Sequence, residues 1–325
     1  LGDVYKRQVH LFEGLGPIPR GKNGFVPGRT LFDSAPVLAA LALNETELNA
    51  AFGADRREEE HGASGLLSFF TGQRTHVVLK AKEEIVLRPH GHLLRTGGLF
   101  HPDESALTST TWMDGVFHSM MTQGHVSINR FLSTTHSYLG LFKSHGLRVF
   151  IDSGHGWVRL GLPSAYAMSP ESCRWIYRHA DGLLEVVSQG LTDSHALTLE
   201  LKVLEGAPVR CLFSHHVALN GDDGQVDGAV LWERRDSVIR VKTVPDTELG
   251  RRFPEGGFNI IPGPSTVIDV VTGDESLYLD GLSRQQPFLC LATAFSKAAE
   301  LRYEGDLIPE TQREAMPDAD RYWRT

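Results

Sequence analysis

Histidine is the first residue type to consider for a metal site, with fifteen copies in the chain. His90 and His92 are separated by one residue, and on a β-strand this spacing points both rings to one face, as in some metal sites. No carboxylate or third histidine follows at a matching spacing, so we interpret both as hydrogen-bonding or turn residues. His215 and His216 are adjacent and face opposite sides of a strand, which argues against joint ligation. The sequence predicts no metal site.

Acidic residues are the next candidates, because glycosidic bond cleavage uses Asp or Glu as a general acid. Asp114 in WMDGVF and Asp152 in IDSGHG each lie beside a turn or strand end. A hairpin turn accounts for Asp152, since Asp-Ser-Gly is favourable turn chemistry. Asp114 has no acidic partner. The chain also contains no HExxH, P-loop, GxSxG or GxGxxG in its proper context, so we predict neither a catalytic residue nor a bound cofactor.

Aromatic residues give a different signal. Sugars stack an apolar ring face on an aromatic side chain, while neighbouring polar groups bind the hydroxyls. The candidate carbohydrate contacts are therefore Trp112, Asp114, His118, Trp157 and Trp175. For each tryptophan the alternative is packing in the core.

In the segments that must position these residues, apolar and polar side chains alternate with a period of two residues, as in β-strands. Apolar and polar residues alternate from Thr110 to Ser133, and Gln123-Gly124 breaks this run into two predicted strands. From Leu66 onward the sequence predicts about fifteen strands with almost no helix between them. Many short strands joined by tight turns form antiparallel sheets, and this number requires two sheets face to face. We therefore predict a mainly β protein with a large antiparallel β-sandwich; no repeating blade sequence indicates a propeller.

Several local predictions follow from the turn signals. Three hairpins are expected, pairing 147–152 with 157–162, 174–179 with 183–189, and 196–204 with 209–219. Further short strands are expected at 84–87 and 276–279. Residues 35–52 are predicted to be helical, either as one helix or as two with Asn44 capping the second. Residues 55–65 are predicted to form a loop.

Composition limits the partners. The 325 residues carry a net charge of −8 with a pI near 6.0, which argues against nucleic acid because phosphate binding requires clustered Lys and Arg. No apolar run approaches the roughly 18 residues of a membrane span. Cys173, Cys211 and Cys290 are widely spaced, and we interpret them as reduced core thiols of a cytoplasmic protein.

Both ends of the chain differ from ordinary domain ends. The initial LGDVYKRQ lacks methionine and resembles translated sequencing-adaptor DNA, so residues 1–8 are interpreted as a scar. Residues 9–65 are expected to be a lead-in with one or two short helices, and residues 66–308 the β-sandwich. Residues 309–325 end in ADRYWRT and are expected to begin a linker helix, because acidic residues precede the Tyr-Trp pair. The chain is thus expected to be part of a longer protein.

Several stretches carry a family resemblance. They are SFFTGQRTHVVLKAKEEIVLRPHGHLLRTGG, TTWMDGVFHSMMTQGHVSINRFLS, GLRVFIDSGHGWVRLGLPSAYAMSPESCRWIYRH, RCLFSHHVALNG and RQQPFLCLATAFSKAAELRYEGDL. Together they resemble the bacterial proteins grouped with cellobiose phosphorylase and the β-glucan phosphorylases, over residues 66–307.

This resemblance implies an N-terminal super-β-sandwich of the galactose-mutarotase-like type, followed by a linker helix and an (α/α)6 barrel. Proteins of this group are inverting enzymes that use inorganic phosphate to cleave β-linked glucosides and release a sugar 1-phosphate. Their general acid and phosphate site lie in the barrel, so no catalytic residue transfers to this chain. The implied partners are a β-glucan or other oligosaccharide, the barrel domain and a second copy of the chain.

Three functional hypotheses remain at this point. The first is a non-catalytic β-sandwich domain of a glycoside phosphorylase-like or hydrolase-like enzyme. The second is a free-standing carbohydrate-binding or mutarotase-like module, and the third is a purely structural sandwich.

Overall fold

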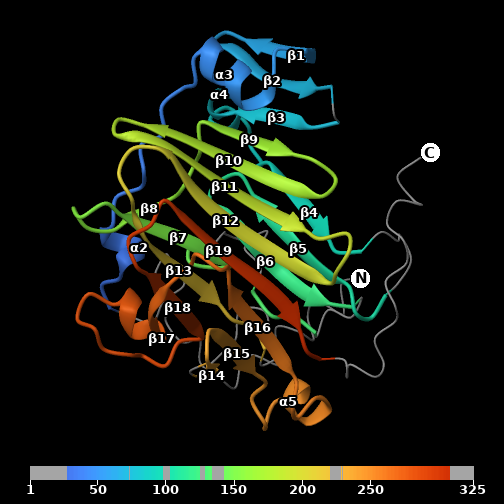
Figure 1. Ribbon diagram of the computed structural model, residues 1–325, viewed down its shortest axis with the longest axis vertical. Coiled ribbons are helices and arrows are strands. Elements are labelled where there is room, and N and C mark those ends of the chain that lie inside the picture. The colour runs from blue at the N-terminus through green and yellow to red at the C-terminus, as the bar shows by residue number, and fades with distance from the viewer. Residues whose placement is uncertain are drawn as a thin grey trace, which may run out of the picture.

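Two antiparallel β-sheets packed face to face make up the protein (Figure 1). The computed structural model describes residues 28–72, 74–97, 103–124, 129–133, 143–219, 228 and 230–307. The prediction of a mainly β, large antiparallel β-sandwich is therefore confirmed. The expected scar at 1–8 and the linker helix at 309–325 lie outside the described residues.

The first sheet has 11 strands in the order β1-β2-β3-β9-β10-β11-β12-β19-β16-β15-β14. In chain order these strands are β1 (Arg56–Gly62), β2 (Gly65–Thr71), β3 (His76–Leu79), β9 (Ala165–Met168), β10 (Ser172–His179), β11 (Gly182–Gly190), β12 (Ala196–Glu205), β14 (Leu231–Arg235), β15 (Val238–Lys242), β16 (Gly257–Pro262) and β19 (Ala298–Gly305).

The second sheet has 8 strands, in the order β17-β18-β13-β7-β6-β5-β4, with β8 paired to β7. Its strands are β4 (Gly91–Arg95), β5 (Leu107–Trp112), β6 (Val116–Gln123), β7 (Leu147–Asp152), β8 (Val158–Arg159), β13 (Arg210–His216), β17 (Ile268–Thr272) and β18 (Phe288–Thr293). The helices of the described residues are short: α2 (Leu31–Ser34), α3 (Glu45–Phe52), α4 (Lys80–Glu83), α5 (Glu248–Arg252) and the 3₁₀ helix η1 (Asp274–Leu277).

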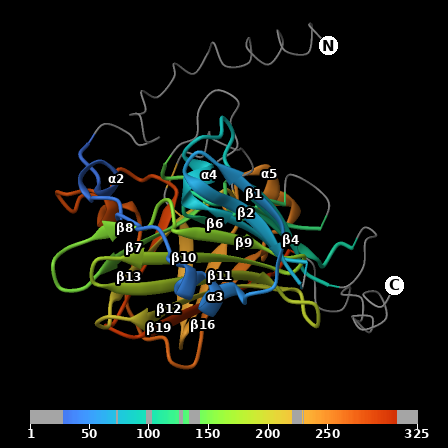
Figure 2. The same cartoon turned by 90° about the horizontal axis from the view of Figure 1, so that it is seen from above.

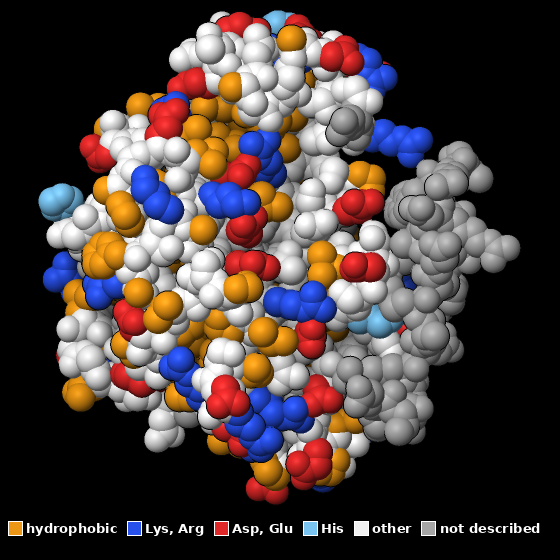
Figure 3. Space-filling view, in the orientation of Figure 1, with side chains coloured by type: hydrophobic (Ala, Val, Ile, Leu, Met, Phe, Trp, Pro, Cys, Tyr) orange, Lys and Arg blue, Asp and Glu red, His pale blue; other side chains and the backbone are white. Residues whose placement is uncertain are grey.

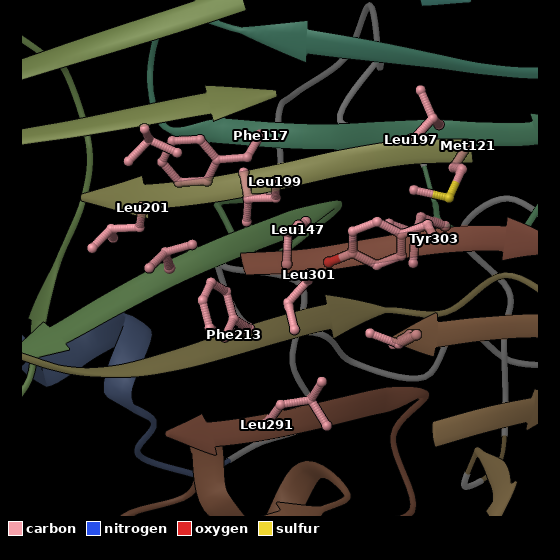
Figure 4. Packing of buried hydrophobic residues seen from close by; sticks show 14 of the residues in the cluster. Phe117, Met121, Leu147, Leu197, Leu199, Leu201, Phe213, Leu291, Leu301 and Tyr303 are labelled. Carbon is pink, nitrogen blue, oxygen red and sulfur yellow. The ribbon is translucent and has the colours of Figure 1, made fainter. Parts of the chain in front are cut away.

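The core lies between the sheets because successive side chains of a strand point to opposite faces. Leu197, Leu199 and Leu201 of β12 point toward the 8-stranded sheet, where they meet residues such as Phe117 and Phe213 (Figure 4). All of these side chains are nearly or fully buried. Burying each one stabilises the fold by about 1.5–3 kcal/mol before entropy is counted.

The outer faces of the two sheets are partly covered by short helices. Leu48 of α3 packs against Phe69 and Ile176 on the outer face of the 11-stranded sheet. On the other side of the sandwich, Phe32 of α2 meets Phe150 of β7 edge to face, with ring centroids 5.0 Å apart. Figure 2 shows α2 and α3 on opposite sides of the sandwich.

The exposed surface of the 11-stranded sheet has charges of both signs interspersed (Figure 3). Arg178, for example, pairs with Glu47 at 2.7 Å and with Glu205 at 2.6 Å. Exposed ion pairs of this kind contribute about 0–1 kcal/mol each. Their role here is mainly to keep the broad outer surface of the sheet polar.

The N-terminal helix prediction was partly wrong. Helix α3 begins at Glu45, and Asn44 caps it as expected, accepting a hydrogen bond from the Glu47 amide at 3.0 Å. Residues 35–43 are not helical, and Val37 among them forms a parallel bridge with Arg159 of β8. Neither alternative is fully right: within 35–52 the capped helix after Asn44 exists, and no first helix precedes it.

Three other local predictions were wrong. The expected loop at 55–65 contains β1, a highly charged edge strand paired with β2. Its charged residues suggested a solvent-exposed loop, but on an edge strand they protect the sheet from pairing with further strands. The expected strand at 84–87 follows the helical turn α4, and the expected strand at 276–279 overlaps η1.

Two of the three predicted hairpins are confirmed. Strand β10 pairs with β11, and β7 pairs with β8. The third is wrong, because β12 lies in the 11-stranded sheet and β13 in the 8-stranded sheet. The turn between them therefore carries the chain from one sheet to the other at one end of the sandwich.

Candidate functional site

Trp175 lies in the core and presents no surface to a ligand. Its side chain is 0% exposed, and its ring centroid lies 4.9 Å from that of Phe117 and 5.0 Å from that of Tyr166. The indole Nε1 donates a hydrogen bond to the carbonyl oxygen of Trp112 at 3.1 Å. For this predicted sugar contact, the structure favours the packing alternative.

His118 is also 0% exposed. Its Nε2 donates to the carbonyl oxygen of Thr198, and its Nδ1 accepts from the Ser109 hydroxyl, both at 3.0 Å. Burial lowers the pKa of His118 to about 4, so the ring is neutral at pH 7. His118 thus joins the two sheets through neutral hydrogen bonds and does not reach the surface.

Trp112 and Asp114 lie at the tight connection between β5 and β6. Trp112 is half-buried and Asp114 is exposed, so both retain surface for a ligand. The connection is firmly held: Gly115 has φ +62°, and a Cβ there would lie 2.3 Å from the Leu160 carbonyl oxygen. Buried Arg148 also donates from Nη1 to the main-chain carbonyls of Asp114 (2.8 Å) and Gly115 (3.2 Å).

Trp157 belongs to a partly exposed cluster at one end of the sandwich. The Arg210 guanidinium lies 4.9 Å from the Trp157 ring centroid and 5.6 Å from that of Phe295, which is 53% exposed. The Nη2 of Arg210 pairs with Asp152 at 2.9 Å. We call these four residues, Trp157, Arg210, Phe295 and Asp152, the Trp157 cluster.

The loop between β7 and β8 fixes the geometry of this cluster. The Asp152 carboxylate accepts hydrogen bonds from the amides of Gly154 (2.7 Å) and Gly156 (2.9 Å). Burial alone would raise the pKa of Asp152, but these amides and Arg210 outweigh it and hold the pKa below its usual value. The buried Asp152 carboxylate therefore holds Arg210 beside the partly exposed aromatic face of Trp157.

The sequence identified only part of this cluster. Trp157 was a predicted contact and Asp152 was assigned to the turn, whereas Arg210 and Phe295 were missed. Arg210 faces Asp152 across the pairing of β13 with β7. This pairing depends on the crossing of the chain between sheets, which no local turn signal indicates.

A pocket of about 500 Å³ opens at the same end of the sandwich. Its apolar wall includes Ile151 and Val209, which directly precede Asp152 and Arg210 and face the opposite side of their strands. His155 and His179 line its polar part. The pocket and the Trp157 cluster therefore lie on opposite faces of the same end of β7 and β13.

Proton donation to a glycosidic oxygen requires a carboxyl group with a raised pKa. Among the described residues, the carboxyls whose pKa clearly departs from the usual value all lie below it: Glu60, Asp152, Glu205, Glu233 and Asp280. Hydrogen bonds from lysine or arginine are the first cause for all except Asp152. None of these five is suited to act as a general acid at neutral pH.

The histidine pair that suggested a metal site does not gather further ligands. His90 pairs through Nδ1 with Glu83, while the ring of His92 is half-buried and has its pKa lowered by burial. Within the described ranges, no group of three or more His, Cys, Asp or Glu side chains is placed to hold a metal ion. The helices described here are also all too short to cross a membrane.

Comparison with known proteins gives a family match. Residues 54–302 match the family described as the glycoside phosphorylase supersandwich domain. A 1,2-β-oligoglucan phosphorylase of Listeria innocua serovar 6a is 27% identical over 206 residues, which are 63% of this chain and 19% of that protein. The chain thus spans less than a fifth of this relative.

A solved polysaccharide lyase structure also aligns with the chain, with a TM-score of 0.38 and 11% identity. The alignment covers 64% of this chain and 33% of the lyase. A likeness this weak carries no argument about function.

Proposed function

The chain belongs to the glycoside phosphorylase supersandwich domain family, and on that basis we propose that it is the non-catalytic β-sandwich of an enzyme acting on β-linked glucosides. The observation that carries this proposal is the extent of the family match. It begins just before β1 and ends within β19, so it takes in both sheets. The oligoglucan phosphorylase relative supports a β-glucan as the sugar.

In the proposed reaction, inorganic phosphate attacks the anomeric carbon of a β-glucoside and inverts it. The bond to the departing oxygen breaks, a carboxylic acid protonates that oxygen, and the products are a sugar 1-phosphate and a shortened glucan. The acid and the phosphate site are assigned to an (α/α)6 barrel elsewhere in the protein. The family match covers the supersandwich domain alone, which supports this division of roles.

The sandwich itself is proposed to border the sugar. In the Trp157 cluster, the indole offers an apolar face to a glucose ring, and Arg210, which Asp152 holds in place, offers donors for its hydroxyls. Trp112 and Asp114, on the β5–β6 connection, remain further contacts in this proposal.

We also place the protein in the cytoplasm. The three cysteines are buried free thiols, which suits a reducing compartment.

The experiment is to recover the natural gene and assay the longer protein with a 1,2-β-oligoglucan and inorganic phosphate. Glucose 1-phosphate formation is expected, and a Trp157→Ala variant is expected to raise KM more than it lowers kcat. Release of free glucose without phosphate consumption would show a hydrolase instead. An unchanged KM in the variant would remove Trp157 from the sugar site.

A further inference from the structure

A second pocket, of about 530 Å³, lies on a different part of the sandwich. Its lining comes from the end of α3, from described residues near the facing ends of β2 and β3, and from the turn between β9 and β10; these elements lie near the top of Figure 1. Ser172, at one end of β10, lines this pocket, whereas His179, at the other end, lines the pocket beside the Trp157 cluster. At about 3.3 Å per residue, the two ends of β10 lie about 23 Å apart.

The back of this pocket is rigid. Arg174 of β10 donates from Nη1 to the carbonyl oxygen of Ala51 at 2.6 Å, and its Nε pairs with Glu185 of β11. Its guanidinium lies 5.3 Å from the ring centroid of Phe52, which in turn packs edge to face on Phe69 at 6.0 Å. The aromatic ring and the cation are therefore already in place before any ligand arrives.

The β9–β10 turn is also held by its own hydrogen bonds. The Ser172 amide donates to the Ser169 hydroxyl at 3.1 Å, and the Ser169 amide donates to the Ser172 carbonyl oxygen at 2.8 Å. This arrangement leaves Glu171 exposed at the pocket. A ligand therefore meets a preformed turn, which reduces the entropy that is lost on binding.

Two charged groups of the pocket have unused hydrogen-bonding capacity. Within the described part of the chain, neither the Arg74 guanidinium nor the Glu171 carboxylate makes a side-chain hydrogen bond or ion pair, and both are exposed. Arg74 offers only donors and Glu171 only acceptors. Thr75 adds a hydroxyl that can do both.

The balance of these groups indicates the class of ligand. Glu171 disfavours an anion, and Glu185 already neutralises Arg174. The many hydroxyl and charged groups disfavour an apolar molecule. A neutral ligand rich in hydroxyl groups satisfies donor and acceptor together and places its C–H face against Phe52. The volume is within the range of about 300–1,000 Å³ that is usual for small-ligand pockets.

We infer that this pocket is an accessory binding site for a neutral oligosaccharide, separate from the Trp157 cluster. The choice of a β-linked glucan as that oligosaccharide rests on the proposed function. Arg74 donates to sugar hydroxyls, Glu171 accepts from them, and Phe52 provides the apolar contact.

The test is calorimetric titration of the 325-residue chain with a 1,2-β-oligoglucan, carried out in a Trp157→Ala background so that the Trp157 cluster does not contribute to binding. Arg74→Ala and Glu171→Gln are each expected to weaken binding about tenfold, since each removes a hydrogen bond to a charged group. The matched controls are Arg88→Ala and Glu255→Gln, which alter exposed residues outside the pocket and are expected to leave binding unchanged. Inorganic phosphate is not expected to compete.

Absence of binding, binding that survives both pocket substitutions, or competition by phosphate would each overturn the inference. These outcomes are distinct from failure of the proposed function. If the longer protein forms glucose 1-phosphate while the pocket variants bind like the wild type, only the accessory site is wrong. If the pocket binds the glucan and the longer protein forms no glucose 1-phosphate, the proposed function is wrong.

Discussion

Two buried histidines between the sheets should make the stability of this protein strongly dependent on pH. His118 bonds to Ser109 and Thr198, and His215 bonds through Nδ1 to the Leu289 carbonyl at 3.1 Å and through Nε2 to the Tyr303 hydroxyl at 2.9 Å. Both side chains are 0% exposed. Burial lowers the pKa of each to about 4 from the usual 6.5.

The size of the effect follows from these pKa values. In the unfolded chain each imidazole binds a proton below about pH 6.5, whereas in the folded chain it does so only below about pH 4. The contribution is therefore fully present above pH 6.5 and is lost as the pH falls toward 4. Each histidine then costs about 3 kcal/mol by pH 4, and the pair about 6, against a typical total stability of about 5–15 kcal/mol.

The assay is urea unfolding at a series of pH values from 7 to 4.5. Each buried histidine should contribute a slope of about 1.4 kcal/mol per pH unit in the middle of this range. A His118→Gln variant should lose that contribution, although it is also less stable at pH 7. The control is His155→Gln, because His155 is exposed.

A free energy of unfolding that is flat between pH 6.5 and 4.5 would refute this reasoning. An equal pH slope in wild type and His118→Gln would do the same for His118 alone. Either result would mean that the folded state accepts the proton without cost.

Three substitutions give further expectations. Gly115→Ala should destabilise the protein by more than about 1 kcal/mol in urea unfolding, because its Cβ would meet the Leu160 carbonyl at 2.3 Å in a left-handed conformation. Trp175→Ala should cost about 3–5 kcal/mol while leaving oligoglucan affinity unchanged by calorimetry, since the ring is buried. Asp152→Asn should destabilise the chain at neutral pH by removing the ion pair with Arg210; the difference from wild type should vanish in acid unfolding experiments as the wild-type carboxyl becomes protonated.

The strands of the fold were largely predictable because burial follows the same period of two as the sequence. Strand β11 alternates buried and half-buried residues along its whole length, and β10 pairs with it across the turn that the sequence indicates. The charged sequence of β1 led to the prediction of a loop, whereas an edge strand can be highly polar. Local turn signals also could not show that β12 and β13 belong to different sheets.

The candidate site was less predictable, because it also depends on how the strands are distributed between the two sheets. Trp157 and Trp175 both lie in strand-rich sequence, yet one is partly exposed at a sheet end and the other is fully buried. Which of them faces solvent depends on the second sheet, and this is a tertiary property. Arg210 reaches Asp152 only through the register of β13 against β7.

The most direct measurement is phosphorus NMR of the 325-residue chain incubated with a 1,2-β-oligoglucan and inorganic phosphate. We predict that the phosphate signal persists and that no sugar 1-phosphate appears, because the general acid and the phosphate site are assigned to another domain. Steady formation of a sugar 1-phosphate by this purified chain would contradict the account, because it would place the catalytic groups within the sandwich itself.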